Sequence, residues 1–196
     1  MGFFTKLFKQ TSKGEFEMTE QLNIGIILGS TREGRVSPQV GKWIKEIADQ
    51  RGDANYEIVD IADYNLPLLG EDETEGITHW NAKLSELDGF IFIVQEYNHS
   101  LSGSLKNALD LAREAWNNKV AGIVSYGSTG GVRAAEHLRG ILGELMIADV
   151  RANPALSLFT DFDNFTQFKP QDLHTDNVNQ MLYQVNNWAK ALKSIR

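Results

Sequence analysis

The segment Gly29–Ser37 contains the residue types that bind a phosphate group. It reads Gly-Ser-Thr-Arg-Glu-Gly-Arg-Val-Ser, follows the apolar run Leu22–Leu28 and precedes an amphipathic stretch. This order predicts a strand, a loop and the N-terminus of a helix, where unpaired backbone N–H groups attract anions. Arginine side chains form forked hydrogen bonds to phosphate oxygens, and hydroxyl groups add further donors. We therefore expect a phosphate site made by Ser30, Thr31, Arg32, Arg35 and Ser37.

The same segment has a simpler interpretation as a polar surface turn between a strand and a helix. Its glycines do not fit the pattern GxGxxG, and the pattern GxxxxGK[ST] is absent. Those spacings mark dinucleotide-binding folds and P-loops, so neither of these two nucleotide sites is indicated.

Two further polar segments follow apolar runs later in the chain. Gln95–Ser100 comes directly after Phe90–Val94, and Tyr126–Gly131 comes directly after Val120–Ser125. The first can present backbone amides and the flat side chain of Tyr97 to a planar ring, while glycines in the second let the backbone approach a ligand closely. A phosphate site beside a flat polar slot, without metal ligands, suits flavin mononucleotide (FMN). The residues expected to line the slot are Gln95, Glu96, Tyr97, Asn98, Ser125, Gly127, Gly130 and Gly131.

Apolar runs alternate with amphipathic segments, which predicts short strands joined by helices and hence a parallel sheet covered on both faces. The expected strands are Leu22–Leu28, Tyr56–Ile61, Phe90–Val94, Val120–Ser125 and a last strand from Met146–Val150 and Ala155–Leu158. The expected helices run from Pro38 to near Gly52 and over Ile77–Leu87, Leu101–Trp116, Val132–Leu145 and Asp176–Lys193, with Asp161–Thr175 irregular. In a doubly wound sheet of about five strands in the order 2-1-3-4-5, the carboxyl ends of the strands share one edge, so the three polar segments converge there.

Residues 1–20 are expected to be an extension of a single domain that covers residues 21–196. Met1–Lys13 places phenylalanine and leucine side chains at helical spacing with lysines between them. Such a basic amphipathic helix can lie on a membrane surface or dock on a partner chain. A loosely ordered extension without membrane contact is the interpretation that we favour.

The composition excludes several classes of protein. A net charge of −7 argues against non-specific nucleic-acid binding. The chain has no cysteine, which rules out disulfides and thiolate metal sites, and its four histidines are too scattered to indicate a zinc site. No apolar run reaches the length of a membrane span and no secretory signal is visible. A cytoplasmic location is therefore expected.

Gly29–Arg35, Glu96–Ser100 with Leu105–Asp110, and Ser125–Ala134 form a recognisable set of motifs. Through them the chain resembles the NADPH-dependent FMN reductase family of flavodoxin-like proteins, which includes quinone, chromate and azo-dye reductases. The resemblance implies a flavodoxin-like three-layer sandwich with a five-stranded parallel sheet.

The resemblance covers roughly Leu22 to Val150, with two departures. Members of the family usually carry proline where Gln95 stands and often where Ser102 stands. At the first of these positions, a side-chain amide offers an alternative way of bonding the flavin.

By resemblance, Ser30, Arg32 and Ser37 hold the FMN phosphate. Glu96, Tyr97 and Asn98 line the isoalloxazine ring, partly through backbone groups. Its pyrimidine side is closed by Ser125, Gly127, Gly130 and Gly131.

The resemblance implies an FMN-dependent oxidoreductase that takes a hydride from NAD(P)H and passes two electrons to a quinone, an azo compound or a free flavin. Because the flavin carries the hydride, no catalytic side chain and no metal are expected. Relatives are commonly dimers or tetramers, so we expect a homodimer or homotetramer. The alternatives are a non-enzymatic flavodoxin-type electron carrier and a flavin-binding interaction module. Arg32 and Arg35 weigh against the carrier, since flavodoxins hold the phosphate in an uncharged loop.

Overall fold

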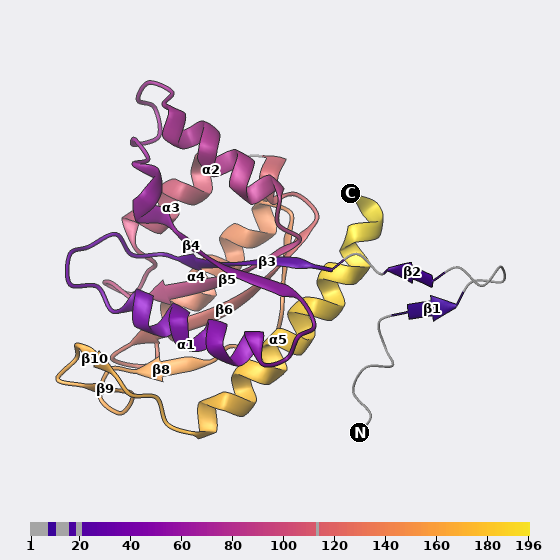
Figure 1. The fold of residues 1–196 in the computed structure, drawn as a ribbon. Coiled ribbons are helices and arrows are strands. Elements are labelled where there is room, and N and C mark those ends of the chain that lie inside the picture. Colours follow the sequence, from indigo (N-terminus) through magenta and orange to yellow (C-terminus); the bar gives the residue numbers. More distant parts are fainter. Residues whose placement is uncertain (1–7, 11–15, 19–20, 113) are drawn as a thin grey trace.

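A parallel sheet forms the centre of the molecule in the computed structural model, which describes residues 8–10, 16–18, 21–112 and 114–196 (Figure 1). In chain order the elements are β1 (Phe8–Gln10), β2 (Phe16–Met18), β3 (Asn23–Leu28), α1 (Ser37–Asp49), β4 (Asn55–Asp60), η1 (Ile61–Tyr64), α2 (Glu75–Ser85), β5 (Gly89–Gln95), α3 (Gly103–Asp110), η2 (Glu114–Trp116), β6 (Lys119–Gly127), α4 (Val132–Glu144), β7 (Ile147–Asp149), β8 (Ala155–Ser157), β9 (Phe162–Asp163), β10 (Gln167–Phe168), α5 (Leu173–Leu192) and η3 (Lys193–Ile195).

The strands of the sheet lie in the order β4-β3-β5-β6, with β7 and β8 along the outer edge of β6. All of these pairs are parallel. Strand β7 pairs with the first residues of β6 and β8 pairs with its last residues, so the expected last strand is present in two short parts. The predicted order 2-1-3-4-5 is confirmed.

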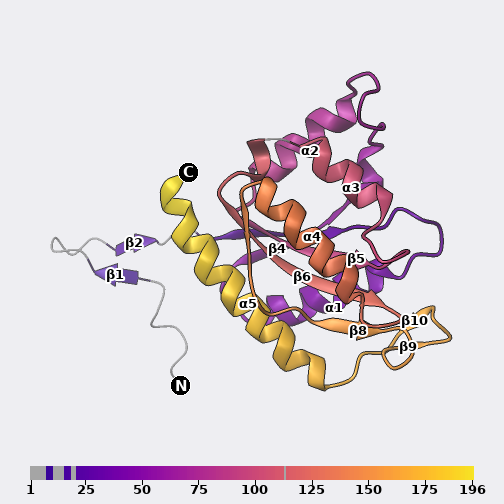
Figure 2. The same cartoon turned by 180° about the vertical axis from the view of Figure 1, so that it is seen from behind.

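Helices cover both faces of the sheet, as Figure 1 and the reverse view in Figure 2 show. Helices α1 and α5 pack on one face, and α2, α3 and α4 pack on the other. Every residue of β5 and of β6 is buried, which is what continuous apolar runs predict for strands covered on both sides. The three-layer sandwich expected from the sequence is therefore confirmed.

The helix predicted over Leu101–Trp116 is wrong in its second half, because α3 ends at Asp110 and η2 follows it. Two buried indoles explain the early end. Trp80 Nε1 donates to the carbonyl of Ala108 at 2.9 Å and Trp116 Nε1 donates to that of Leu109 at 3.0 Å. In a longer helix, these carbonyls would accept bonds from the next turn of backbone.

Two other boundaries differ from the sequence prediction. The segment expected to be irregular contains the antiparallel pair β9 and β10, and α5 begins before Asp176. At the N-terminus, Phe8–Gln10 is a strand paired with β2, so the amphipathic helix considered as an alternative for Met1–Lys13 is not present over these residues. The rest of Met1–Lys13 lies outside the described residues. Within the ranges that the structure describes, no helix is both long enough and apolar enough to cross a membrane.

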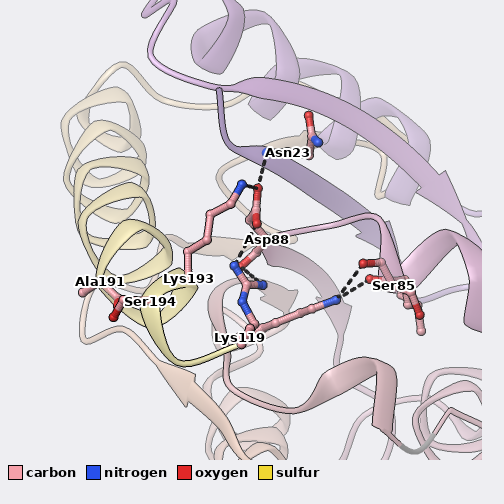
Figure 3. A network of polar contacts seen from close by, with 9 residues as sticks. Asn23, Ser85, Asp88, Lys119, Ala191, Lys193 and Ser194 are labelled. Atoms are coloured by element: carbon pink, nitrogen blue, oxygen red, sulfur yellow. Dashed lines mark hydrogen bonds and ion pairs between the residues drawn. The ribbon is translucent and has the colours of Figure 1, made fainter. Parts of the chain in front are cut away.

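A polar network at the amino edge of the sheet holds the end of the chain (Figure 3). Asp88 accepts hydrogen bonds from the backbone N–H of Asn23 at 2.9 Å, from Lys193 at 3.3 Å and from Arg196 at 2.8 Å. Burial would raise the pKa of the Asp88 carboxyl, but these donors and their charges lower it overall. Nearby, the ammonium group of Lys119 is buried and donates to the end of α2.

Lys119 gives the folded protein a specific pH dependence. Burial lowers the pKa of its ammonium group to about 8, and the charge of Arg196 acts in the same direction. An unfolded chain binds this proton up to about pH 10.4, so it holds more protons than the folded chain across this window. The free energy of unfolding should then rise with pH, by up to about 1.4 kcal/mol per unit. Urea unfolding of wild type and Lys119→Met at pH 7.5 to 10 tests this, and a difference between them that does not change with pH would contradict it.

Candidate functional site

The loops that follow β3, β5 and β6 meet at the carboxyl edge of the sheet. They enclose a cavity of about 170 Å³, to which residues of the segment after β8 also contribute. Its lining residues are Arg32, Arg35, Val36, Gln95, Glu96, Tyr97, Tyr126, Gly127, Leu158 and Phe165. The structure therefore brings part of all three predicted segments into one cavity.

The loop after β3 leaves several donors free. The N-cap of α1 is Val36, and no side chain caps the helix. Among the described residues of the loop, only Gly29 and Arg35 pair their backbone N–H with a backbone carbonyl. Ser37 is fully buried, and its Oγ makes no hydrogen bond of good geometry in the described chain, although the Tyr126 phenol is close enough to interact with it. A buried hydroxyl without a partner is costly, and a phosphate oxygen is a ligand that would satisfy it.

The two arginines of this loop differ in their partners. Arg35 forms an ion pair with Asp60, whose other oxygen accepts the N–H of Ala62 at 3.1 Å and so caps η1. Arg32 is exposed, and its guanidinium has no hydrogen bond or ion pair with any residue that the structure describes. Arg32 is therefore the free cation of the loop, while the charge of Arg35 is largely compensated.

Gln95 supports the first loop from the neighbouring strand. Its Nε2 donates to the Gly29 carbonyl at 2.9 Å, and the hydroxyls of Ser102 and Ser104 donate to the same oxygen at 2.6 Å and 3.1 Å. One hydrogen of this amide nitrogen is therefore engaged inside the protein, and bonding of a flavin by the Gln95 amide stays a prediction. Oε1 of Gln95 is buried without a partner and can only accept a hydrogen bond.

The residues after β5 form a tight turn. Tyr97 and Ser100 exchange both backbone hydrogen bonds at 2.9 Å, and the two residues between them have positive φ angles, 49° for Asn98 and 68° for His99. In the described structure, no protein group accepts the backbone N–H of either middle residue. The ring of Tyr97 is 42% exposed and lines the cavity. The turn thus offers two amides and a flat side chain.

The Glu96 side chain is engaged within the protein. Its carboxylate accepts the backbone N–H of Arg133 at 3.2 Å and the guanidinium Nε at 2.6 Å. The same guanidinium also contacts His99 Nε2 at 2.8 Å and Thr129 Oγ1 at 3.1 Å. The Glu96 side chain therefore joins the turn to the N-terminus of α4. The backbone N–H of Glu96 is also engaged, because it donates to the Tyr126 carbonyl at 2.9 Å.

The glycine segment after β6 packs closely behind this turn. Gly130 and Gly131 have φ angles of 76° and 69°, and the Ser125 hydroxyl donates to the Gly130 carbonyl at 2.7 Å. Gly131, which has no side chain, is the N-cap of α4. No backbone acceptor is found for the N–H groups of Ser128 and Thr129 in the described chain. The Glu96 carboxylate therefore caps the start of α4 through the N–H of Arg133, and the N–H groups of Ser128 and Thr129 are left as donors at the same edge.

Residues 22–161 match the model of the family described as NADPH-dependent FMN reductase. The chain belongs to this family. It is 35% identical over 146 residues to an NAD(P)H-dependent FMN reductase of Schizosaccharomyces pombe, covering 69% of this chain and 73% of the relative. It is 34% identical over 137 residues to a quinone reductase of Escherichia coli, covering 64% and 71%.

Solved structures show the same fold at lower identity. A flavoenzyme NAD(P)H:(acceptor) oxidoreductase from Paracoccus denitrificans has a TM-score of 0.70 at 18% identity, covering 87% of this chain and 98% of that one. A flavodoxin, WrbA-like protein from Agrobacterium tumefaciens has a TM-score of 0.57 at 17% identity, covering 88% and 99%. The flavodoxin-like fold expected from the sequence is therefore confirmed.

The predicted site residues of this FMN reductase family member differ in their position relative to the cavity. Arg32, Arg35, Gln95, Glu96, Tyr97 and Gly127 line the cavity. Ser30, Ser37, Ser125, Gly130 and Gly131 are buried behind it, and Asn98 is exposed on the turn. Thr31 faces a neighbouring cavity of about 460 Å³.

Four cavity residues were not among the site residues expected from the sequence, namely Val36, Tyr126, Leu158 and Phe165. Burial raises the pKa of the Tyr126 phenol, opposed by the Ser37 hydroxyl and the loop arginines nearby, so the phenol stays neutral and can donate a hydrogen bond. Leu158 and Phe165 come from the segment after β8. Because β8 is parallel to β6, its carboxyl end lies at the same edge of the sheet as those of β3, β5 and β6. The segment that follows β8 could therefore have been predicted to contribute to the site.

A larger hollow of about 600 Å³ lies elsewhere, beside α2 and α3. Its lining includes the carboxylates of Glu71, Glu73, Asp110 and Glu114. A negatively charged lining repels a phosphate, so the smaller cavity at the carboxyl edge is the better candidate for a phosphorylated cofactor.

Proposed function

We propose that the chain binds FMN non-covalently at the carboxyl edge of the sheet and reduces a quinone or a flavin at the expense of NAD(P)H. The observation that carries the proposal is the uncapped start of α1. There the buried Ser37 hydroxyl, which makes no hydrogen bond of good geometry in the described chain, lies in the same loop as the free guanidinium of Arg32. Family membership supports the same activity.

The protein's own groups have distinct roles in this proposal. Ser30, Ser37 and Arg32, with the free N–H groups of their loop, would hold the phosphate. Tyr97 and the turn amides would hold the ring, with the Glu96–Arg133 contact fixing the turn. Donors at the start of α4 would stabilise negative charge on the ring. When bound, FMN accepts a hydride from NAD(P)H and gives electrons to the second substrate.

The alternative functions are less well supported. An electron carrier or an interaction module would not need NAD(P)H, whereas the family model and the curated relatives quoted above are reductases. Azo compounds as acceptors, a homodimer or homotetramer, and a cytoplasmic location rest on the sequence alone and remain part of the proposal.

The identity of the cofactor is the most direct test. An adenylate attached to the phosphate would have to pass Arg32 and the ion pair between Arg35 and Asp60, so FMN should be retained and FAD should not. Mass spectrometry of the cofactor released by heating should find FMN. Anaerobic NADPH or NADH should then bleach the yellow protein, and menadione should restore its colour. Recovery of FAD alone, or apo-protein that takes up no FMN, would overturn the proposal.

A further inference from the structure

The segment between β8 and α5 places one aromatic side chain, Phe165, in the lining of the cavity and a second, Phe159, against it. Strands β9 and β10 form a hairpin whose tip contains Phe165, and Phe159 lies just before the hairpin. The two rings contact each other edge to face, with centroids 5.7 Å apart and an interplanar angle of 83°. Phe165 lines the cavity together with Arg32 and Tyr97. Residues 162–168 lie beyond the part of the chain that the family model matches.

The base of this hairpin is firmly attached to the domain. Phe168 packs against Trp43 of α1 and against Phe162, with ring centroids 5.4 Å and 5.1 Å apart. The Gln39 side chain accepts the N–H of Phe168 and donates to the carbonyl of Thr166, both at 2.9 Å. The position of the tip is therefore set by the folded domain.

Asp161 organises the other end of the segment. This fully buried carboxylate accepts the backbone N–H of Ser157 at 2.8 Å and that of Gln171 at 3.1 Å, and it contacts His174 Nε2 at 3.0 Å. Its own carbonyl accepts the N–H of Lys169 at 2.8 Å. These bonds close the segment into a compact loop and leave the aromatic tip on the outside.

The tip itself is unfavourable for folding. Asn164 and Phe165 both have positive φ angles, 51° and 59°. Asparagine tolerates this conformation, whereas a bulky side chain there is a strained exception. The two rings also stay in contact with water, since Phe159 is 68% exposed and Phe165 is 56% exposed. Strain of this kind persists at sites where function requires it.

We propose that Phe165, supported by Phe159, is the specificity-determining residue for flat aromatic electron acceptors of the quinone class. The ring of Phe165 provides a surface on which a flat acceptor stacks when it enters the cavity occupied by FMN. The inference rests on the proposed function, because it assumes FMN in that cavity. It goes further in naming which side chain selects the acceptor.

Phe165→Gly separates this role from a role in folding. Glycine adopts the positive φ angle without strain, so the midpoint of urea unfolding should stay equal or rise, although a ring is lost. Stacking is typically weak to moderate, so the KM for menadione should rise roughly threefold to tenfold. The KM for ferricyanide, which is not flat, should not change. Phe165→Tyr keeps a flat ring and should restore the KM for menadione.

Binding of an unreactive ring gives a readout that does not depend on turnover. FMN-loaded, oxidised protein is titrated with 1,4-dimethoxynaphthalene, and binding is followed by the change in flavin absorbance. Phe165→Gly should bind it more weakly by the same factor, while Tyr183→Ala on α5, which removes an aromatic ring that is 62% exposed, should bind it as wild type does.

The outcomes distinguish this inference from the proposed function. Wild-type protein that takes up no FMN would overturn both. Normal FMN uptake with unchanged menadione KM and unchanged ring binding in Phe165→Gly would overturn the inference alone. A fall in the urea midpoint with equal losses for menadione and ferricyanide would assign Phe165 a structural role, which also overturns the inference.

Discussion

Arg32→Ala should weaken FMN binding roughly tenfold to a hundredfold while the protein stays folded. A hydrogen bond to a charged group is typically worth about 1.5–3 kcal/mol, and about 1.4 kcal/mol corresponds to one factor of ten. The exposed Arg32 side chain has no hydrogen-bond or ion-pair partner in the described chain, so its removal breaks no polar contact that supports the fold. Titration of apo-protein with FMN, followed by flavin fluorescence at fixed ionic strength, measures the dissociation constant.

Glu33→Gln is the matched control for this prediction. It lies next to Arg32 in the same exposed turn and changes the charge of the loop by one unit in the opposite direction. Exposed charges that act only at a distance are screened by salt, so its effect should be small and should shrink as salt is added. If Arg32 contacts the phosphate directly, Arg32→Ala should change the FMN dissociation constant much more than Glu33→Gln does. An FMN dissociation constant in Arg32→Ala equal to that of wild type would contradict the phosphate site.

The part of the site that the sequence predicts is the part set by topology. Apolar runs indicated β3, β5 and β6, and a parallel sheet forces the segments after them to one edge. The uncapped start of α1 and the positive φ angles of Gly130 and Gly131 follow from local residue types. These features need no knowledge of which side chains meet across the fold.

The remaining features depend on contacts between distant residues. The carboxylate of Glu96 is taken by Arg133, and the amide of Gln95 is taken by the Gly29 carbonyl, 66 residues earlier in the chain. The early end of α3 depends on indoles from elsewhere in the chain. Local patterns do not indicate such pairings, so the sequence could predict which residues lie at this edge but not which side chains are engaged by other parts of the protein.

Gly131→Ala should both destabilise the fold and abolish tight FMN binding. A Cβ at this position would lie 2.6 Å from the backbone N and 2.7 Å from the backbone O of Tyr126. These atoms belong to the central strand β6 and cannot rotate away, and the φ angle of 69° adds strain for any side chain. Together the clash and the strain should lower the free energy of unfolding by roughly 2–4 kcal/mol. The loop must also shift, which would move the free N–H groups of Ser128 and Thr129 away from the proposed position of the flavin ring.

Gly140→Ala provides the control within the same helix. Gly140 is exposed in the interior of α4, and no atom lies within 4 Å of a Cβ built on it. Alanine is favoured over glycine in a helix by about 1 kcal/mol, so this variant should be more stable than wild type and should bind FMN equally well. Urea unfolding of both variants measures the change in the free energy of unfolding, and FMN titration measures the change in the dissociation constant. A Gly131→Ala protein with the stability and FMN affinity of wild type would show that the segment after β6 does not have to approach β6 so closely, and that its glycines are not needed to build the site.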